Sequence, residues 1–190
     1  MKKNIAICAL FSLVAFSSFA QEFRGLDKSP MDRAYLPDNY AHDRKFAPER
    51  KLGESAILKV DYSRPQKKGR VVFGGMVSYN ELWRLGANEA TEIKVYKDIR
   101  IGGKSLNMGT YSMFAIPTKD NWTIIFSSDL DCWGQYSYNK EHDVLRLETP
   151  VIANKDIVEE LSIQFEDLDE GKAVMYIAWD MIRVELAVSY

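Results

Sequence analysis

A period-two alternation of apolar and polar side chains runs through residues 161–189 and determines the expected fold class. The apolar positions are Leu161, Ile163, Phe165, Ala173, Met175, Ile177, Trp179, Ile182, Val184, Leu186 and Val188. Successive side chains of a β-strand point to opposite faces of the sheet, so this pattern is typical of half-buried strands. The acidic run 167–171 ends in glycine and is the expected turn between two of these strands.

Shorter segments with the same alternation follow one another from residue 55 onward. They cover residues 56–62, 71–73, 92–96, 99–106, 110–116, 122–126 and 144–148. With the C-terminal strands they make about nine or ten strands, separated by glycine, proline and polar turns. Such a series predicts an all-β fold, either an antiparallel β-sandwich or a flattened barrel. A chain of 190 residues favours one domain, which we place at residues 55–190.

Residues 21–54 lack this alternation. They are polar, contain three prolines and carry scattered aromatic side chains, among them Tyr35 and Tyr40. We expect an irregular N-terminal arm that packs on the domain, with these two tyrosines as its anchors. The alternative is a disordered linker, which such a polar composition also allows.

The longest stretch that strand alternation does not explain is 62–91. Within it, Ser78 is followed three residues later by Glu81, which fits a capping box, and Gly86 stands where a helix commonly ends. We therefore expect one short helix near residues 79–85.

The first 20 residues have the composition of a secretory signal peptide. Lys2 and Lys3 precede an apolar run from Ile5 to Phe16, and small residues precede a cleavage site after Ala20. A membrane anchor is the alternative, but spanning a bilayer takes roughly 20 apolar residues and this run is shorter. We expect an exported protein, periplasmic or secreted, that does not span the membrane once the signal peptide is cleaved.

The composition of residues 21–190 bears on partners and on disulfides. The whole chain has a formal net charge of −2, and removing Lys2 and Lys3 leaves −4. We therefore expect no nucleic-acid partner, because such binding needs a strongly basic face. Cys132 is the only cysteine left after cleavage, so an internal disulfide is impossible. Its thiol is expected to be buried, or else paired with another chain.

A series of short motifs also stands in a characteristic order along the chain. The motifs are Ser29-Pro30-Met31-Asp32, Tyr62-Ser63-Arg64-Pro65, Lys68-Gly69-Arg70, Phe73-Gly74-Gly75, Trp83-Arg84, Gly86-Ala87-Asn88-Glu89-Ala90-Thr91, Gly102-Gly103-Lys104, Gly109-Thr110-Tyr111, Ile116-Pro117, Trp133-Gly134 and Asp143-Val144-Leu145-Arg146. Their order resembles that of an exported bacterial family known as domain of unknown function 2911 (DUF2911). The likeness covers residues 29–190 and implies one intact domain, but it implies no activity, cofactor or catalytic residue. Cys132 lies outside the family pattern.

Charged and polar residues of the stretch 62–91 are candidates for a binding site. They are Arg64, Arg70, Arg84, Asn88 and Glu89. Arginine can grip a carboxylate, phosphate or sulfate through two parallel hydrogen bonds, and the other two residues can bond sugar hydroxyls. The structural alternative is that Arg84 pairs with Glu89 and that Arg64 binds a loop carbonyl. We hypothesise that Arg64, Arg84, Asn88 and Glu89 converge on one concave site.

The expected loop 127–143 supplies a second group of candidates. It carries Trp133, Tyr136 and Tyr138. Exposed aromatic side chains can stack on a sugar ring or cover an apolar patch of a partner, and Trp83 or Trp133 can offer a flat apolar face to a ligand. The structural alternative is that Trp133 closes one end of the sandwich.

Two classes of function remain open. The first is a non-catalytic module that binds a small polar or anionic ligand, a glycan or an envelope protein. The second is a hydrolase of envelope or extracellular carbohydrate, with Glu89 and a second carboxylate, Asp129 or Asp131, as its catalytic pair. No serine stands in a Gly-x-Ser-x-Gly motif, and His42 and His142 belong to no metal-binding spacing, so we expect neither a metal nor another cofactor.

Overall fold

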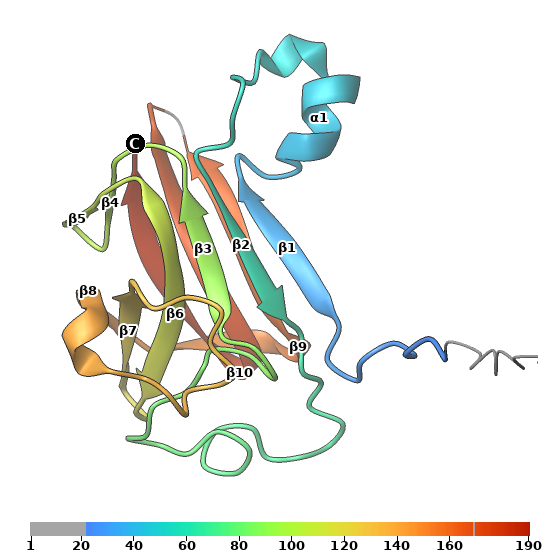
Figure 1. Cartoon of the computed structure of the whole chain (residues 1–190), viewed down its shortest axis with the longest axis vertical. Coiled ribbons are helices and arrows are strands. Elements are labelled where there is room, and N and C mark those ends of the chain that lie inside the picture. Colours follow the sequence, from blue (N-terminus) through green and yellow to red (C-terminus); the bar gives the residue numbers. More distant parts are fainter. Residues whose placement is uncertain (1–21, 169) are drawn as a thin grey trace, which may run out of the picture.

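A computed structural model describes residues 22–168 and 170–190 of the chain. The predicted signal peptide, residues 1–20, lies outside the described residues. The expected all-β fold is confirmed: two antiparallel sheets pack on one another, and because neither closes on itself the fold is a sandwich and not a barrel (Figure 1).

The first sheet has six strands in the order β1-β2-β3-β6-β7-β8, and the second has four in the order β5-β4-β10-β9. The bounds are β1 (Met31–Leu36), β2 (Leu58–Ser63), β3 (Thr91–Val95), β4 (Ile99–Ile101), β5 (Lys104–Leu106), β6 (Gly109–Pro117), β7 (Asn121–Ser127), β8 (Asp143–Pro150), β9 (Ile152–Leu168) and β10 (Lys172–Ser189). The strand segments expected from alternation correspond to most of these elements, with one exception at 71–73, where the chain turns.

The apolar faces of the two sheets form one core. Leu161, Ile163 and Phe165 of β9 are buried, as their alternation predicts, and they join a cluster that includes Ile93 of β3 and Ile124 of β7. Fully burying an aliphatic or aromatic side chain of this size contributes about 1.5–3 kcal/mol. The core therefore supplies the main stabilisation, and it includes residues from strands far apart in the sequence.

Strand β10 folds back sharply. If β10 were straight, its 18 residues would span roughly 60 Å. However, the amide of Tyr190, just after the strand, donates to the carbonyl of Gly171, just before it, at 2.9 Å. The pairing of β10 with β9 shifts register on both sides of Asp180, whose φ is 57°. Figure 1 shows the C-terminus at the same end of the molecule as the start of β10. The bend lies beside Trp179, which is 2% exposed.

The predicted helix at 79–85 is wrong. Asn80 and Leu85 have positive φ angles of 63° and 54°, which no α-helix accommodates. Trp83 instead forms a bridge with Ala115 of β6. The amide of Trp83 donates to the carbonyl of Ala115 at 2.7 Å, and the amide of Ala115 donates to the carbonyl of Trp83 at 2.8 Å. Because backbone polar groups need partners when they leave water, this strand-like pairing replaces the bonds of a helical turn.

The one α-helix of the described residues is α1 (Tyr40–Phe46), and 3-10 turns occur at η1 (Pro48–Arg50) and η2 (Lys140–His142). Helix α1 and strand β1 both lie within the segment 21–54, so the expectation of an irregular arm does not hold over that stretch.

Strand β1 pairs with β2 over its whole length, from Met31 opposite Ser63 to Leu36 opposite Leu58. Only Ala34 and Leu36 of its side chains are buried, too few to produce a visible period.

Tyr35 and Tyr40 lie at the junction of β1 and α1, with ring centroids 6.0 Å apart. The hydroxyl of Tyr40 donates to the carbonyl of Gly53 at 2.7 Å, and its ring is buried. The segment after α1 is thus fastened to the domain through this tyrosine.

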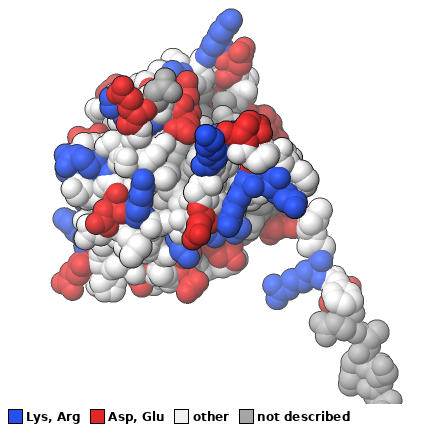
Figure 2. Space-filling model, turned by 90° about the horizontal axis from the view of Figure 1, so that it is seen from above, with Lys and Arg blue, Asp and Glu red and all other residues white. Residues whose placement is uncertain are grey.

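Basic and acidic side chains are interspersed over the face of the molecule shown in Figure 2. Within residues 22–168 and 170–190, no helix combines the length and the apolar character needed to cross a bilayer.

Candidate functional site

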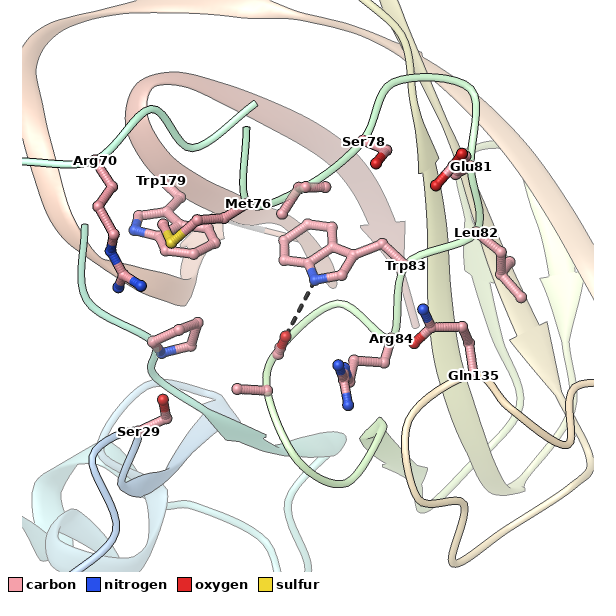
Figure 3. Close-up of a pocket in the computed structure, with 14 residues that line it drawn as sticks. Ser29, Arg70, Met76, Ser78, Glu81, Leu82, Trp83, Arg84, Gln135 and Trp179 are labelled. Carbon is pink, nitrogen blue, oxygen red and sulfur yellow. Dashed lines mark hydrogen bonds between the residues drawn. The ribbon is translucent and has the colours of Figure 1, made fainter. Parts of the chain in front are cut away.

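A cavity of about 430 Å³ lies where the non-alternating segment 65–87 passes over the bend of β10 (Figure 3). Its walls also include Ser29 from the N-terminal segment and Gln135 from the loop between β7 and β8. The residues that line it are Ser29, Pro65, Arg70, Met76, Val77, Ser78, Glu81, Leu82, Trp83, Arg84, Gly86, Ala87, Gln135 and Trp179. Pockets of roughly 300–1,000 Å³ are typical of small-molecule sites.

Two tryptophans give the cavity an aromatic wall. The rings of Trp83 and Trp179 are stacked, with centroids 6.1 Å apart and planes inclined by 21°. Trp122 and Phe73 meet Trp83 edge-on at 5.8 and 6.1 Å. Trp83 Nε1 donates to the carbonyl of Gly86 at 3.1 Å, which fixes the orientation of the indole.

The loop after Trp83 is fastened to the ends of β2 and β3. The hydroxyl of Ser63 donates to the carbonyl of Ala87 at 2.5 Å and accepts from its amide at 2.7 Å. Thr91 Oγ1 donates to the carbonyl of Leu85 at 2.7 Å. A Cβ at Gly86 would lie 2.9 Å from Ser63 Oγ, so only glycine allows the loop to approach this closely.

Arg70 and Arg84 place two guanidinium groups at the cavity. Arg70 Nε donates to the carbonyl of Lys67 at 3.0 Å, and its Nη2 to that of Gln66 at 2.6 Å. Arg84 Nη1 donates to the carbonyl of Asn88 at 3.1 Å. Among the described residues, neither arginine forms an ion pair with a carboxylate within 4.0 Å. Within the part of the chain that the structure describes, their positive charges therefore have no acidic partner at this distance.

The loop 127–143 supports Arg84 from the other side. The guanidinium lies over the ring of Tyr136, 6.0 Å from its centroid. Gly134 has a φ of 68°, and a Cβ there would lie 2.9 Å from Arg84 Nη1. A side chain at position 134 would thus be strained and would displace the arginine.

Arg64 does not line this cavity. It holds β9 instead: Nε donates to the carbonyl of Leu161 at 3.2 Å, Nη2 to Ser162 Oγ at 3.0 Å, and Nη1 pairs with Asp32 at 3.0 Å. The structural alternative holds only in part: Arg64 does bind a main-chain carbonyl, but this carbonyl belongs to strand β9 and not to a loop.

Asn88 and Glu89 also lie outside the lining of the cavity. Asn88 has a φ of 60° and contributes its carbonyl to Arg84. Glu89 forms a backbone bridge with Trp133, and no ion pair between Glu89 and Arg84 occurs in the described structure. The hypothesised convergence of Arg64, Arg84, Asn88 and Glu89 on one concave site therefore does not occur, whereas Arg70 and Arg84 both line the cavity.

The aromatic residues of the loop 127–143 differ in exposure. Trp133 is 59% exposed and Tyr136 is 78% exposed, so Trp133 does not close the end of the sandwich. Tyr138 packs on Phe114 with ring centroids 5.2 Å apart, and its hydroxyl donates to Asp143 at 2.8 Å. Trp133 and Tyr136 lie outside the lining of the cavity but flank Gln135, which belongs to it.

Cys132 is buried at the base of the same loop. Burial raises the pKa of its thiol, so the neutral form is favoured. No group of three metal-ligating side chains occurs among residues 22–168 and 170–190.

Sequence reasoning missed Ser29, Met76, Glu81, Gln135 and Trp179 as cavity residues. Trp179 stands in an alternating strand, where a tryptophan is expected in the core, and only the bend of β10 brings it to the cavity. Glu81 was assigned to a helix cap. No local pattern in the sequence distinguishes these residues from ordinary strand and turn positions.

No curated protein and no solved structure matches the chain. A family described as "Protein of unknown function (DUF2911)" matches residues 47–188, which include every lining residue of the cavity except Ser29. Because this match covers most of the 190 residues, the chain belongs to the DUF2911 family.

Proposed function

We propose that the protein is an exported, non-catalytic module that binds a small anionic molecule in the cavity between Arg70 and Arg84. The observation that carries this proposal is the presence of two guanidinium groups, without acidic partners among the described residues, in one cavity walled by Trp83 and Trp179. An anionic group can bind the arginines while an apolar part of the ligand contacts the indoles.

The arginines are well suited to this role because their orientation is already set. Each uses part of its guanidinium to hold a main-chain carbonyl, and Arg84 also rests on Tyr136. A guanidinium has five N–H donors, so further donors remain for a carboxylate or phosphate. Because little side-chain freedom is lost on binding, more of the interaction energy appears as affinity.

Export is supported by the first 20 residues and by nothing in the folded domain. Expression in a Gram-negative host followed by N-terminal sequencing of the purified protein tests it. We expect a chain that begins at Gln21, because the small residues before that position suit signal peptidase. A purified chain that still begins at Met1 would contradict export through this segment.

The hydrolase alternative has no observation in its favour. Glu89, Asp129 and Asp131 are not among the residues that line the cavity, and Glu81 is the one carboxylate among the described residues that line it. Glycan binding remains an outcome of the screen below, because Trp133 and Tyr136 are exposed beside the cavity.

A thermal-shift screen of the purified protein against anionic metabolites and envelope glycans tests the proposal. A ligand that binds only the native state raises the melting temperature. We expect anions to produce such shifts, and we expect Arg84→Gln and Arg70→Gln to abolish them.

Arg100→Gln is the matched control for this screen. Arg100 also donates to a main-chain carbonyl, that of Gly103, but it lies on β4 outside the cavity. Its replacement should leave the ligand-induced shifts unchanged. Equal shifts in the parent and in the double variant of Arg70 and Arg84 would refute the proposed site.

A further inference from the structure

The cavity also contains a negative charge. Glu81 lines it together with Arg70 and Arg84, and its carboxylate forms no ion pair within 4.0 Å among the described residues. Figure 3 shows Glu81 beside Ser78, on the opposite side of the two indoles from Arg70. One cavity thus carries charges of both signs that do not neutralise one another.

The separation of these charges has a structural cause. Arg70 is held by the carbonyls of Lys67 and Gln66, and Arg84 by the carbonyl of Asn88. Glu81 follows the turn at Asn80, whose amide donates to Pro117 at the end of β6. Arg70 and Glu81 are therefore attached to different parts of the framework, whereas Arg84 follows Trp83, whose backbone pairs with β6 as that of Asn80 does.

This arrangement disfavours a ligand that carries only negative charge. An anion held by the arginines would lie in the same cavity as the Glu81 carboxylate, and like charges repel; Glu81 and Arg70 are exposed to water, which weakens this repulsion without removing it. A ligand with a positive group on the side of Glu81 replaces the repulsion by an attraction. An ammonium group has three donors, which suit the carboxylate of Glu81 and the hydroxyl of Ser78.

We propose that the ligand of this cavity is a small zwitterion, a short peptide with an apolar side chain, because its charged ends lie far enough apart to reach Arg70 and Glu81 on opposite sides of the indoles (Figure 3). Its carboxylate binds Arg70 and Arg84, its ammonium binds Glu81, and its apolar part contacts Trp83 and Trp179. This inference rests on the proposed function, because it assigns the ligand class of the same site.

Four probes that share a phenyl ring test the contributions of the positive and the negative charge separately. Phenylalanine carries both, 3-phenylpropanoate lacks the ammonium, and 2-phenylethylamine lacks the carboxylate. The dipeptide alanyl-phenylalanine has its charged ends farther apart, so it distinguishes a free amino acid from a peptide. Each is titrated into the parent protein by calorimetry at one ionic strength and neutral pH.

We expect the dipeptide to bind about tenfold more tightly than either singly charged analogue, since a hydrogen bond to a charged group contributes this order of affinity. Glu81→Gln should remove most of that preference for the zwitterion. It should leave the affinity for 3-phenylpropanoate unchanged or higher, because a repulsive charge is lost.

Glu89→Gln is the control, because Glu89 is an exposed glutamate eight positions away that does not line the cavity. It should bind all four probes as the parent does. The comparison of probes on the parent protein alone needs no variant, so it decides the question even where a substitution impairs folding.

The outcomes separate this inference from the proposed function. If 3-phenylpropanoate binds as tightly as the dipeptide, and Arg84→Gln removes its binding, the site takes simple anions and the zwitterion is refuted. If no probe and no anion of the screen binds the parent, both proposals fail. A loss of zwitterion preference in Glu89→Gln as well as in Glu81→Gln would refute the role of Glu81.

Discussion

Trp83 is the residue through which the fold and the cavity depend on each other, and its removal should be costly. The side chain is 7% exposed, although it stands in a loop segment. It stacks on Trp179 and meets Trp122 and Phe73 edge-on. Its indole N–H donates to the carbonyl of Gly86, so ring packing and a hydrogen bond both depend on it.

The expected cost of Trp83→Ala is roughly 3–5 kcal/mol in the free energy of unfolding, the range for large aromatic-to-alanine changes in a core. Each kilocalorie per mole lowers the melting temperature of a chain this size by about 2–4 °C, so we expect a drop of roughly 6–20 °C. Trp83→Phe retains an aromatic ring but leaves the carbonyl of Gly86 without its donor. That loss costs about 1–3 kcal/mol.

Urea unfolding monitored by circular dichroism measures these differences, and Trp133 provides the control. Trp133 is 59% exposed, and exposed substitutions of this kind usually change stability by less than about 0.5 kcal/mol. The reasoning requires Trp83→Ala to lower the unfolding midpoint far more than Trp133→Ala. Equal midpoints for the two variants would show that the segment around Trp83 is not part of the core.

Three further measurements follow from individual side chains. Arg64→Ala should lower the stability by about 1–3 kcal/mol in urea unfolding without affecting ligand binding, because Arg64 holds Leu161 and lies outside the cavity; loss of binding with unchanged stability would contradict this role. Native Cys132 should react with a disulfide reagent much more slowly than the urea-unfolded chain, because burial raises its pKa; equally rapid labelling of both would argue against burial. Burial and a hydrogen bond to Asp167 raise the pKa of Tyr190 from 10.0 to about 12, so between these pH values the folded state binds more protons than the unfolded state. The stability that Tyr190 contributes through this shift is therefore present below pH 10 and lost as the pH rises to 12. Tyr190→Phe should show a shallower decline of the urea midpoint between pH 10 and 12 than the parent protein.

Alternation predicted the strands well because it reports directly which face of a strand is buried. Its limit is seen in β10, where it predicts two strands but not how they are joined. The apolar positions are odd-numbered up to Trp179 and even-numbered from Ile182 onward. This change of phase corresponds to the register shift around Asp180, since an extra residue reverses the faces of everything after it. The angle of the bend depends on tertiary contacts and has no counterpart in the pattern.

The candidate site was predictable only in part, for a related reason. The arginines of the loops are recognisable in the sequence, and two of them do line one cavity, but Arg64 has the same local signals and serves to hold β9. Likewise, Ser78 and Glu81 satisfy the sequence rule for a helix start. What excludes the helix is the edge of β6, which offers the backbone of Trp83 a partner. Neither the role of Arg64 nor the absence of a helix at 79–85 can be predicted without knowing which strand lies next to each residue in the fold.

The same kind of pairing that replaces the predicted helix explains why a binding site can form in a segment without regular structure. The amide of Lys67 donates to Glu159 of β9 at 2.8 Å, that of Trp83 to Ala115 of β6 at 2.7 Å, and that of Ala90 to Cys132 at 2.9 Å. These bonds join the segment to both sheets and to the loop that carries Gln135. The walls of the cavity are thus fixed before a ligand arrives, and binding need not pay for ordering a loop. A segment attached only at its ends would have to be ordered by the ligand, with a corresponding loss of affinity.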